Sequence, residues 1–210
     1  MDWKLRPLID LINIQSGFAF KSEEYTDSGH FLVRIGNVQD GFLSLDNPKY
    51  VGLDRNTARF DLQEGDILTS LTGNIGRVAM VESSHLPVAL NQRVARLTPK
   101  NSAVLDRGYL FLFLSSDFFK KSLSSIGHGA AQQNVSPKAI GDIEIPLPPL
   151  PEQGRIVARL DALSAETQRL ESVYRQKLAC LAELKQAILQ KAFSGELGAQ
   201  PDKALKKAFA

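Results

Sequence analysis

A long stretch free of helix breakers near the C-terminal end constrains this fold more than any other feature. After Gly154, the next Gly or Pro in the chain is Gly195. Prolines at 146, 148, 149 and 151 come before the stretch, and proline is tolerated at the start of a helix but not inside it. Glu152 adds an acid where it favours a helix N-terminus. The pattern predicts one helix of about forty residues and roughly 60 Å, ended by Ser194-Gly195.

Apolar residues recur along this helix with the 3.5-residue period of a coiled coil. With Leu160 as position a, most a and d positions are apolar over more than four heptads. One helix with such a seam has to pack on its own domain, form a dimerisation stalk or meet a broader partner. Val173 and Leu178, which lie beside the seam, favour a broad partner. The expected interface residues are Leu160, Leu163, Leu170, Tyr174, Leu181, Leu184 and Ile188.

The first 149 residues have the pattern of an α+β domain with a curled antiparallel sheet. Strands are expected at 31–38, 49–52, 65–71, 78–81, 88–97 and 143–145, and Asp106 should cap a helix that reaches about residue 123. Asp40-Gly41 is typical of a hairpin turn. Loops are expected at 14–25, 72–77 and 124–136. The expected division is a globular domain at 1–149, a helical spacer at 150–197 and a tail at 198–210.

Composition indicates a folded protein in the cytoplasm. Hydrophobic residues make up 43% of the chain and charged residues 23%. No run approaches the ~20 apolar residues of a membrane span, and the first residues lack a signal-peptide core. Residues 1–149 hold 15 basic and 16 acidic side chains, so bulk charge does not indicate a nucleic-acid partner. Cationic groups would have to gather on one face.

Enzymatic interpretations find little support, and we expect no catalytic residues, no cofactor site and no metal site. Asn47-Pro48-Lys49-Tyr50 departs from the Asn-Pro-Pro-Tyr motif of amino-methyltransferases, and no glycine-rich cofactor loop accompanies it. Glu183-Leu184-Lys185 matches half of a nuclease motif but lies within the heptads. The histidines have no metal-ligand spacing with the single Cys180.

Two sets of residues resemble the specificity subunits of type I restriction–modification systems. The first is the Pro-Leu-Pro-Pro-Leu-Pro-Glu-Gln entry to the helix, with the segments 184–189 and 192–197 at its far end. The second set lies in the globular part and resembles target recognition domains. Its landmarks are Gly17-Phe18-Ala19-Phe20, Tyr25, Gly29, Arg34-Ile35-Gly36-Asn37, Gly65-Asp66-Ile67-Leu68, Gly73, Gly76, Asn91-Gln92, Gln133-Asn134 and Ser136.

This resemblance implies a non-catalytic subunit that reads a short half-site in double-stranded DNA. The helix would then serve as a spacer and as the dock for a methyltransferase subunit, which a restriction subunit can join. A usual specificity subunit has two recognition domains and two spacers, whereas this sequence matches one of each. Two copies with antiparallel helices would supply the second set. The alternative is a dimerising coiled-coil interaction protein with a peptide- or RNA-binding head.

Two loops, a strand start at Asn91-Gln92-Arg93 and two lone cations carry the side chains expected to contact DNA. Asn, Gln and Arg are residue types that read adenine and guanine edges, and isolated cations suit phosphates. A plain hairpin turn and a solvated loop are the structural alternatives for residues 72–77 and 124–136, and the ordinary polarity of an edge strand is the alternative for residues 91–93. The candidates are Lys21, Arg34, Thr72, Asn74, Arg77, Gln92, Arg93, His128, Gln132, Gln133 and Asn134.

Overall fold

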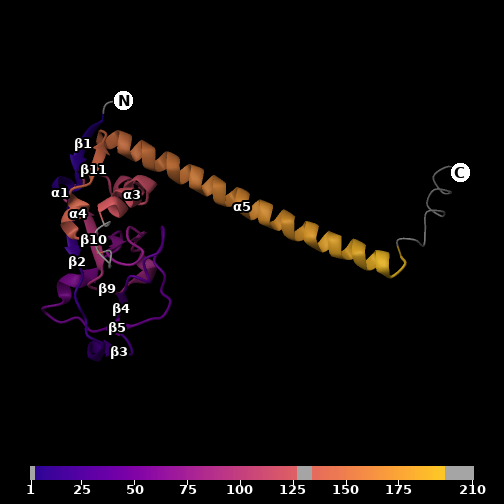
Figure 1. The fold of residues 1–210 in the computed structure, drawn as a ribbon, viewed down its shortest axis with the longest axis horizontal. Coiled ribbons are helices and arrows are strands. Elements are labelled where there is room, and N and C mark those ends of the chain that lie inside the picture. The colour runs from indigo at the N-terminus through magenta and orange to yellow at the C-terminus, as the bar shows by residue number, and fades with distance from the viewer. Residues whose placement is uncertain (1–2, 127–133, 197–210) are drawn as a thin grey trace. The chain divides into compact units, whose positions relative to one another are not determined.

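The computed structural model describes residues 3–126 and 134–196 (Figure 1). The chain divides into two compact units. The first unit runs from residue 1 to residue 157 and the second from residue 158 to residue 210. The first unit holds all the described strands and the first turns of the long helix, and the second holds the rest of the described helix. The candidates His128, Gln132 and Gln133 lie outside the described residues.

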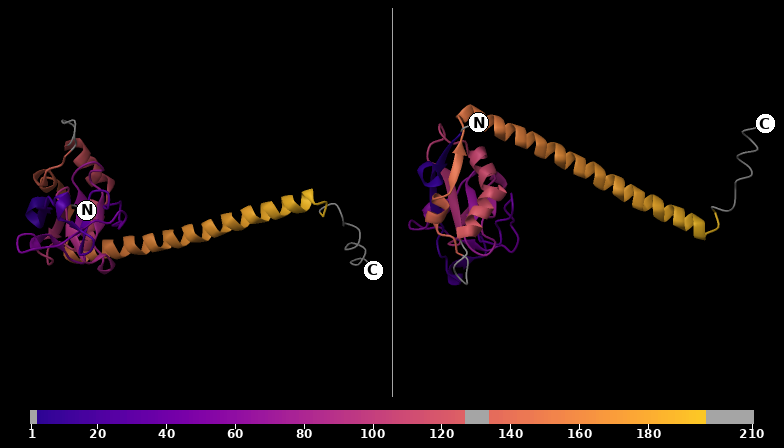
Figure 2. Two further views of the ribbon diagram at one scale, coloured as in Figure 1. Left: turned by 90° about the horizontal axis from the view of Figure 1, so that it is seen from below. Right: turned by 45° about the horizontal axis from the view of Figure 1, so that its top comes forward.

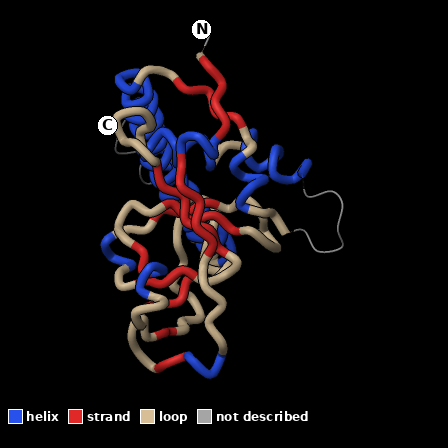
Figure 3. Tube along the Cα trace, turned by 90° about the vertical axis from the view of Figure 1, so that its left-hand side faces the viewer, coloured by secondary structure: helices blue, strands red, loops and turns tan. Residues whose placement is uncertain are grey.

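Three sheets build the first unit, and they confirm the expected α+β class with antiparallel pairing (Figure 3). The four-stranded sheet has the order β2 (Ile12–Ser16), β10 (Val94–Pro99), β7 (Ile67–Ser70), β8 (Val78–Met80). The five-stranded sheet has the order β3 (Tyr25–Thr26), β5 (Tyr50–Val51), β4 (His30–Val33), β9 (Val88–Leu90), β6 (Asp61–Leu62). The third sheet pairs β1 (Lys4–Pro7) with β11 (Glu144–Leu147). Only the β4–β9 pair is parallel among the described strands.

The four-stranded sheet is the central layer, with one hydrophobic core on each of its faces. Successive side chains of a strand point to opposite faces, so neighbouring residues contribute to different cores. Ile67 joins a core with the helices α1 (Leu8–Leu11), α2 (Arg107–Leu114), α3 (Asp117–Ile126) and α4 (Pro137–Gly141). Its neighbour Leu68 joins a second core with Phe31 and Val88 of the five-stranded sheet. The 3₁₀ turns η1 (Ser22–Glu24), η2 (Ala58–Phe60) and η3 (Ser83–His85) lead into β3, β6 and β9.

One loop prediction and one strand prediction were wrong. The loop expected at 14–25 begins inside β2, whose residues pair with β10 from Ala95 to Pro99. The single strand expected at 88–97 is two strands, because the Asn91 side chain accepts from the Gln92 amide at 2.7 Å and turns the chain. β9 and β10 therefore belong to different sheets, and Asn91-Gln92-Arg93 lies in a turn rather than at the start of a strand.

The helix expected at 106–123 breaks at a serine pair. Asp106 caps α2 as predicted, since its Oδ1 accepts from the Tyr109 amide at 2.9 Å. The Ser116 hydroxyl donates to the carbonyl of Phe113 at 2.6 Å and accepts from the amide of Phe119 at 3.3 Å. These bonds end α2 and start α3, because serine side chains compete with the helix backbone for its own donors and acceptors.

Other strand boundaries also differ from the expected ones. The strand expected at 31–38 ends at Val33, since the Asn37 side chain accepts from the Arg34 amide at 3.0 Å and closes a turn. Gly65-Asp66 precedes β7 rather than belonging to it. The Asp40-Gly41 turn is confirmed, with the Gln39 amide donating to the Phe42 carbonyl at 3.0 Å. The elements that the sequence did not predict are β1, α1, β2, β3, β6, α4 and the three 3₁₀ turns.

The long helix α5 (Leu150–Phe193) starts and stops where the sequence predicts (Figure 2). Its 44 residues correspond to a length of about 66 Å. Gly195 adopts a φ of 82°, the left-handed conformation that glycine takes readily just past a helix end. The predicted spacer boundary at residue 197 lies outside the described residues.

Gln153, in the first turn of α5, is fully buried and joins three backbone segments. Its Nε2 donates to the carbonyls of Val104 at 2.9 Å and Pro148 at 2.8 Å. Its Oε1 accepts from the amide of Asp106, the residue that caps α2, at 2.8 Å. Since a buried polar side chain has to be paired, one glutamine fixes the start of α5 to the start of α2.

The apolar seam of α5 is exposed along the second unit. Leu163, Leu181 and Leu184 expose 57%, 61% and 55% of their surface. The other seam residues, Leu160, Leu170, Tyr174 and Ile188, are also exposed. An isolated helix with such a face lacks the apolar partner that stabilises an amphipathic helix in water.

No helix in the described part of the chain is long and apolar enough to cross a membrane.

Candidate nucleic-acid interface

Four of the predicted DNA-binding residues meet around one hollow of about 550 Å³. They come from three segments, namely the loop after β7, the turn between β9 and β10, and the segment before α4. The residues are Thr72, Gln92, Arg93 and Asn134, with Leu71, Gly73 and Val135 completing the lining. The sequence placed them in two loops and at the start of a strand, and the fold brings them together.

Hydrogen bonds hold the three segments at fixed positions. The Leu71 amide donates to the Arg93 carbonyl at 3.0 Å, and the Val135 amide donates to the Leu71 carbonyl at 2.9 Å. The Thr72 hydroxyl donates to Oδ1 of Asn134 at 2.5 Å. These hydrogen bonds order the backbone around the hollow in the free protein, which lowers the entropy cost of binding a ligand.

The side chains at the mouth of this hollow are available for contact. Gln92 and Arg93 are exposed, and neither side chain bonds to a described residue. Asn134 is exposed as well, and its Nδ2 remains free of any described acceptor. Amide and guanidinium groups in such positions can pair with the edges of bases.

The turn that presents Gln92 is built by two of the landmarks identified in the sequence. The Gln92 amide donates to the Phe18 carbonyl at 2.9 Å, and the Phe18 amide donates to the Leu90 carbonyl at 3.1 Å. A Cβ on Gly17 would lie 2.2 Å from the Asn91 carbonyl oxygen. Glycine is therefore required where this strand end crosses the turn.

Replacing Gly17 with Ala is expected to destabilise the first unit by about 2–4 kcal/mol, because backbone at 2.2 Å from the new Cβ has to move. The midpoint of urea unfolding, followed by circular dichroism, measures the effect. Gly52→Ala is the matched control, since a Cβ there meets no atom within 4 Å. Equal midpoints for the two variants would show that the close approach is not strained.

Arg77 and Asn74 lie at the far side of the same loop. The Arg77 guanidinium donates to Oε1 of Gln39 at 2.8 Å and lies 4.0 Å from the Asp40 carboxylate. Lys120 of α3 approaches the same carboxylate to 2.7 Å. Asn74 is exposed. Arg77 is therefore held against the Asp40 turn, about one-third exposed, rather than standing free.

The two lone cations differ in their surroundings. Arg34 donates from Nη2 to the Asn47 carbonyl at 2.5 Å, while its Nε is buried without a partner among the described residues. Arg34 thus ties the turn after β4 to the Asn47 loop, where Asn47 adopts a φ of 54°. Lys21 precedes η1, is exposed and forms no ion pair within residues 3–126 and 134–196.

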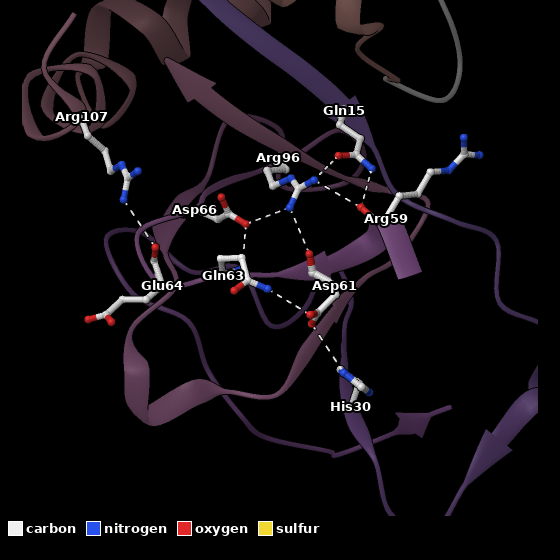
Figure 4. A network of polar contacts seen from close by, with 9 residues as sticks. All are labelled: Gln15, His30, Arg59, Asp61, Gln63, Glu64, Asp66, Arg96 and Arg107. Carbon is white, nitrogen blue, oxygen red and sulfur yellow. Dashed lines mark hydrogen bonds and ion pairs between the residues drawn. The ribbon is translucent and has the colours of Figure 1, made fainter. Parts of the chain in front are cut away.

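A second hollow of about 760 Å³ shares Gln92 with the first. It lies beside β2 and η2 and includes Gln15, Arg59 and Arg96, residues that the sequence interpretation missed. Arg96 is the centre of a polar network between the two large sheets (Figure 4). Its guanidinium donates to the Asp66 carboxylate at 3.1 Å, to the carbonyls of Asp61 and Arg59 at 3.0 and 3.3 Å, and to the Gln15 side chain.

This network explains another landmark. Asp66 is only 7% exposed, and its carboxylate accepts from Arg96 and from the Gln63 amide at 2.9 Å. A buried carboxylate of this kind requires such partners. Asp61 in turn approaches His30 at 3.5 Å and accepts from the Gln63 side chain at 3.0 Å. The Gly65-Asp66 landmark is therefore part of the scaffold.

The pKa values of Tyr109, Asp54 and Glu166 are shifted by local contacts. Burial raises the pKa of Tyr109, whose hydroxyl donates to the Pro146 carbonyl at 2.7 Å inside the fold. Hydrogen bonds from Thr57 lower the pKa of Asp54, and a bidentate contact with Arg169 lowers the pKa of Glu166. All three groups serve local structure. Within residues 3–126 and 134–196, no group of three or more His, Cys, Asp or Glu side chains is placed to hold a metal ion.

Comparisons with known proteins agree over nearly the whole chain. The family model described as the type I restriction modification DNA specificity domain matches residues 1–178. The EcoBI specificity subunit of Escherichia coli is 29% identical over 95% of this chain and 43% of that protein. The EcoAI specificity subunit, also of Escherichia coli, is 31% identical over 82% of this chain and 30% of that protein.

Solved structures agree as well. The crystal structure of the HsdS subunit from Thermoanaerobacter tengcongensis superposes with a TM-score of 0.66 and 27% identity, covering 92% of this chain and 45% of that one. The chain thus spans less than half the length of these relatives. Because the family model covers most of the sequence and the fold agrees, the chain belongs to the type I restriction modification DNA specificity domain family.

Proposed function

We propose that this chain is a non-catalytic DNA specificity subunit that recognises one half-site of a type I restriction–modification target in the cytoplasm. The observation that carries the proposal is the meeting of Thr72, Gln92, Arg93 and Asn134 around one hollow. These residue types read base edges, and here they come from three segments of a rigid frame. Family membership supports duplex DNA as the partner and does not favour a peptide- or RNA-binding head.

In this proposal residues 1–149 form the recognition domain and α5 the spacer that docks a methyltransferase subunit, with a restriction subunit joining the complex. Two copies pair through antiparallel helices along the exposed seam. A two-fold pair reads the same half-site twice, so the preferred target has two-fold symmetry and an unread centre.

The test uses the full chain assembled with the methyltransferase subunit and a randomised duplex library. Gln92→Ala and Asn134→Ala should each relax the preference at one base pair per half-site, by about 1–3 kcal/mol. Gln92→Ala should change the stability by less than about 0.5 kcal/mol, whereas Asn134→Ala also loses the hydrogen bond from Thr72, worth about 0.5–1.5 kcal/mol. Sequencing of the methylated fraction gives the preference. Gln63→Ala and Asn56→Ala are controls, because both residues are exposed and line neither hollow.

If the four variants give one and the same preferred sequence, the hollow is not the reading surface. An asymmetric preferred target would show that the second half-site is read by a different chain.

A further inference from the structure

A cation that the sequence interpretation overlooked stands at the second hollow. Arg59 of η2 is exposed, and its guanidinium carbon lies 4.8 Å from the centroid of the Phe60 ring. Its side chain forms no ion pair or hydrogen bond with any described residue. A guanidinium over an aromatic face can keep the N–H donors that lie in its own plane free for an anion.

The backbone beneath this side chain is held firmly. The Arg59 carbonyl accepts from Gln15 Nε2 at 3.0 Å and from Arg96 Nη2 at 3.3 Å. Figure 4 shows the Arg59 side chain extending away from Arg96, on the side opposite the Asp66 contact. The Arg96 guanidinium thus makes its hydrogen bonds within the fold, and two of the contacts in this network hold the backbone of Arg59 in place.

Gln92 connects this region to the proposed reading surface, because it lines both hollows. Arg93 lines the first hollow with it, and Arg59 lines the second. The first unit is not basic overall, so exposed cations free of acidic partners are the ones that can contribute most to a contact with phosphate.

We infer that the DNA-contacting surface continues from the first hollow across Gln92 into the second, and that Arg59 contacts a DNA phosphate there. Arg96 is a positioning residue, which holds the Arg59 backbone through its carbonyl. The inference rests on the proposed function, since it takes duplex DNA as the partner.

Phosphate contacts have a signature that needs no knowledge of the target sequence. Each one lost lowers the slope of log K against log salt concentration by about one unit, alike on all sequences. The experiment measures binding of a random-sequence duplex by fluorescence anisotropy across a potassium chloride series. It uses the full chain, alone and assembled with the methyltransferase subunit.

Arg59→Gln removes the charge and keeps an aliphatic stem over Phe60. It should reduce the slope by about one unit without changing the target preference, and Arg59→Lys should keep the wild-type slope. Arg55→Gln is the matched control, since Arg55 is exposed, lies just before η2 and lines neither hollow. It should leave the slope unchanged. Thermal unfolding of the variants confirms an intact fold.

The outcomes separate the two proposals. A wild-type slope for Arg59→Gln overturns the inference and leaves DNA recognition standing. Equal reductions for Arg59→Gln and Arg55→Gln show diffuse attraction and also overturn it. If the wild-type chain binds no duplex in either form, the proposed function fails as well. A change in preferred sequence with Arg59→Gln would make Arg59 a base contact, which also contradicts the inference.

Discussion

Replacing Gln153 with Glu is expected to lower the free energy of unfolding of the first unit by about 3–5 kcal/mol. The change exchanges the donor Nε2 for an oxygen of nearly equal size. Two carbonyls, those of Val104 and Pro148, would then face a buried carboxylate at less than 3 Å. Equilibrium urea unfolding, monitored by circular dichroism and by the fluorescence of the single Trp3, measures the loss.

Gln176→Glu is the matched control for this experiment. Gln176 lies on the same helix and is exposed, so the same chemical change there should cost less than about 0.5 kcal/mol. Similar unfolding energies for the two variants would mean that the three bonds of Gln153 contribute nothing net to the fold. The position would then be free to accept a charge.

Replacing Leu170 and Leu181 together with Glu is expected to separate the proposed pair of helices completely. The two residues expose 42% and 61% of their surface in the single chain, and in a pair they would meet an apolar partner. Each pair would then bury four carboxylates without partners, at a cost of several kcal/mol each. Light scattering at micromolar concentration should change from twice the chain mass to the chain mass, and methylation of DNA by the assembled complex should disappear.

Ala165→Glu combined with Ala179→Glu provides the control for that pair. Both alanines are exposed and lie at the heptad position opposite the seam, so the added charge is the same while the seam is unchanged. This variant should keep the mass of the pair. A wild-type chain that stays monomeric even with the methyltransferase subunit present would refute the pairing itself.

The sequence predicted best where local chemistry decides the structure. α5 begins after its prolines and ends at Gly195, and Asp106 caps α2, because caps and breakers act within a few residues. The seam was visible for the same reason, since a heptad is a local pattern. These features needed no knowledge of the tertiary fold.

The sequence was a poorer guide to features that depend on contacts between segments far apart in the chain. Nothing local indicates that Thr72 meets Asn134, sixty-two positions later. The role of Gln153 depends on three backbone groups that only the folded chain brings together. Arg59 was missed because a single exposed arginine gives no pattern. The alternation of apolar and polar residues in Ile12-Asn13-Ile14-Gln15, by contrast, was a strand signal that could have been recognised.

The turn between β9 and β10 carries a consequence for how such a protein changes its target over generations. Backbone groups and the Asn91 side chain make all the hydrogen bonds that anchor this turn to Phe18, Val33 and Leu71. The side chains of Gln92 and Arg93 take no part in them. If Gln92 and Arg93 read bases as proposed, mutation can change both side chains at almost no cost in folding free energy, and one or two codon changes would be enough to alter the target.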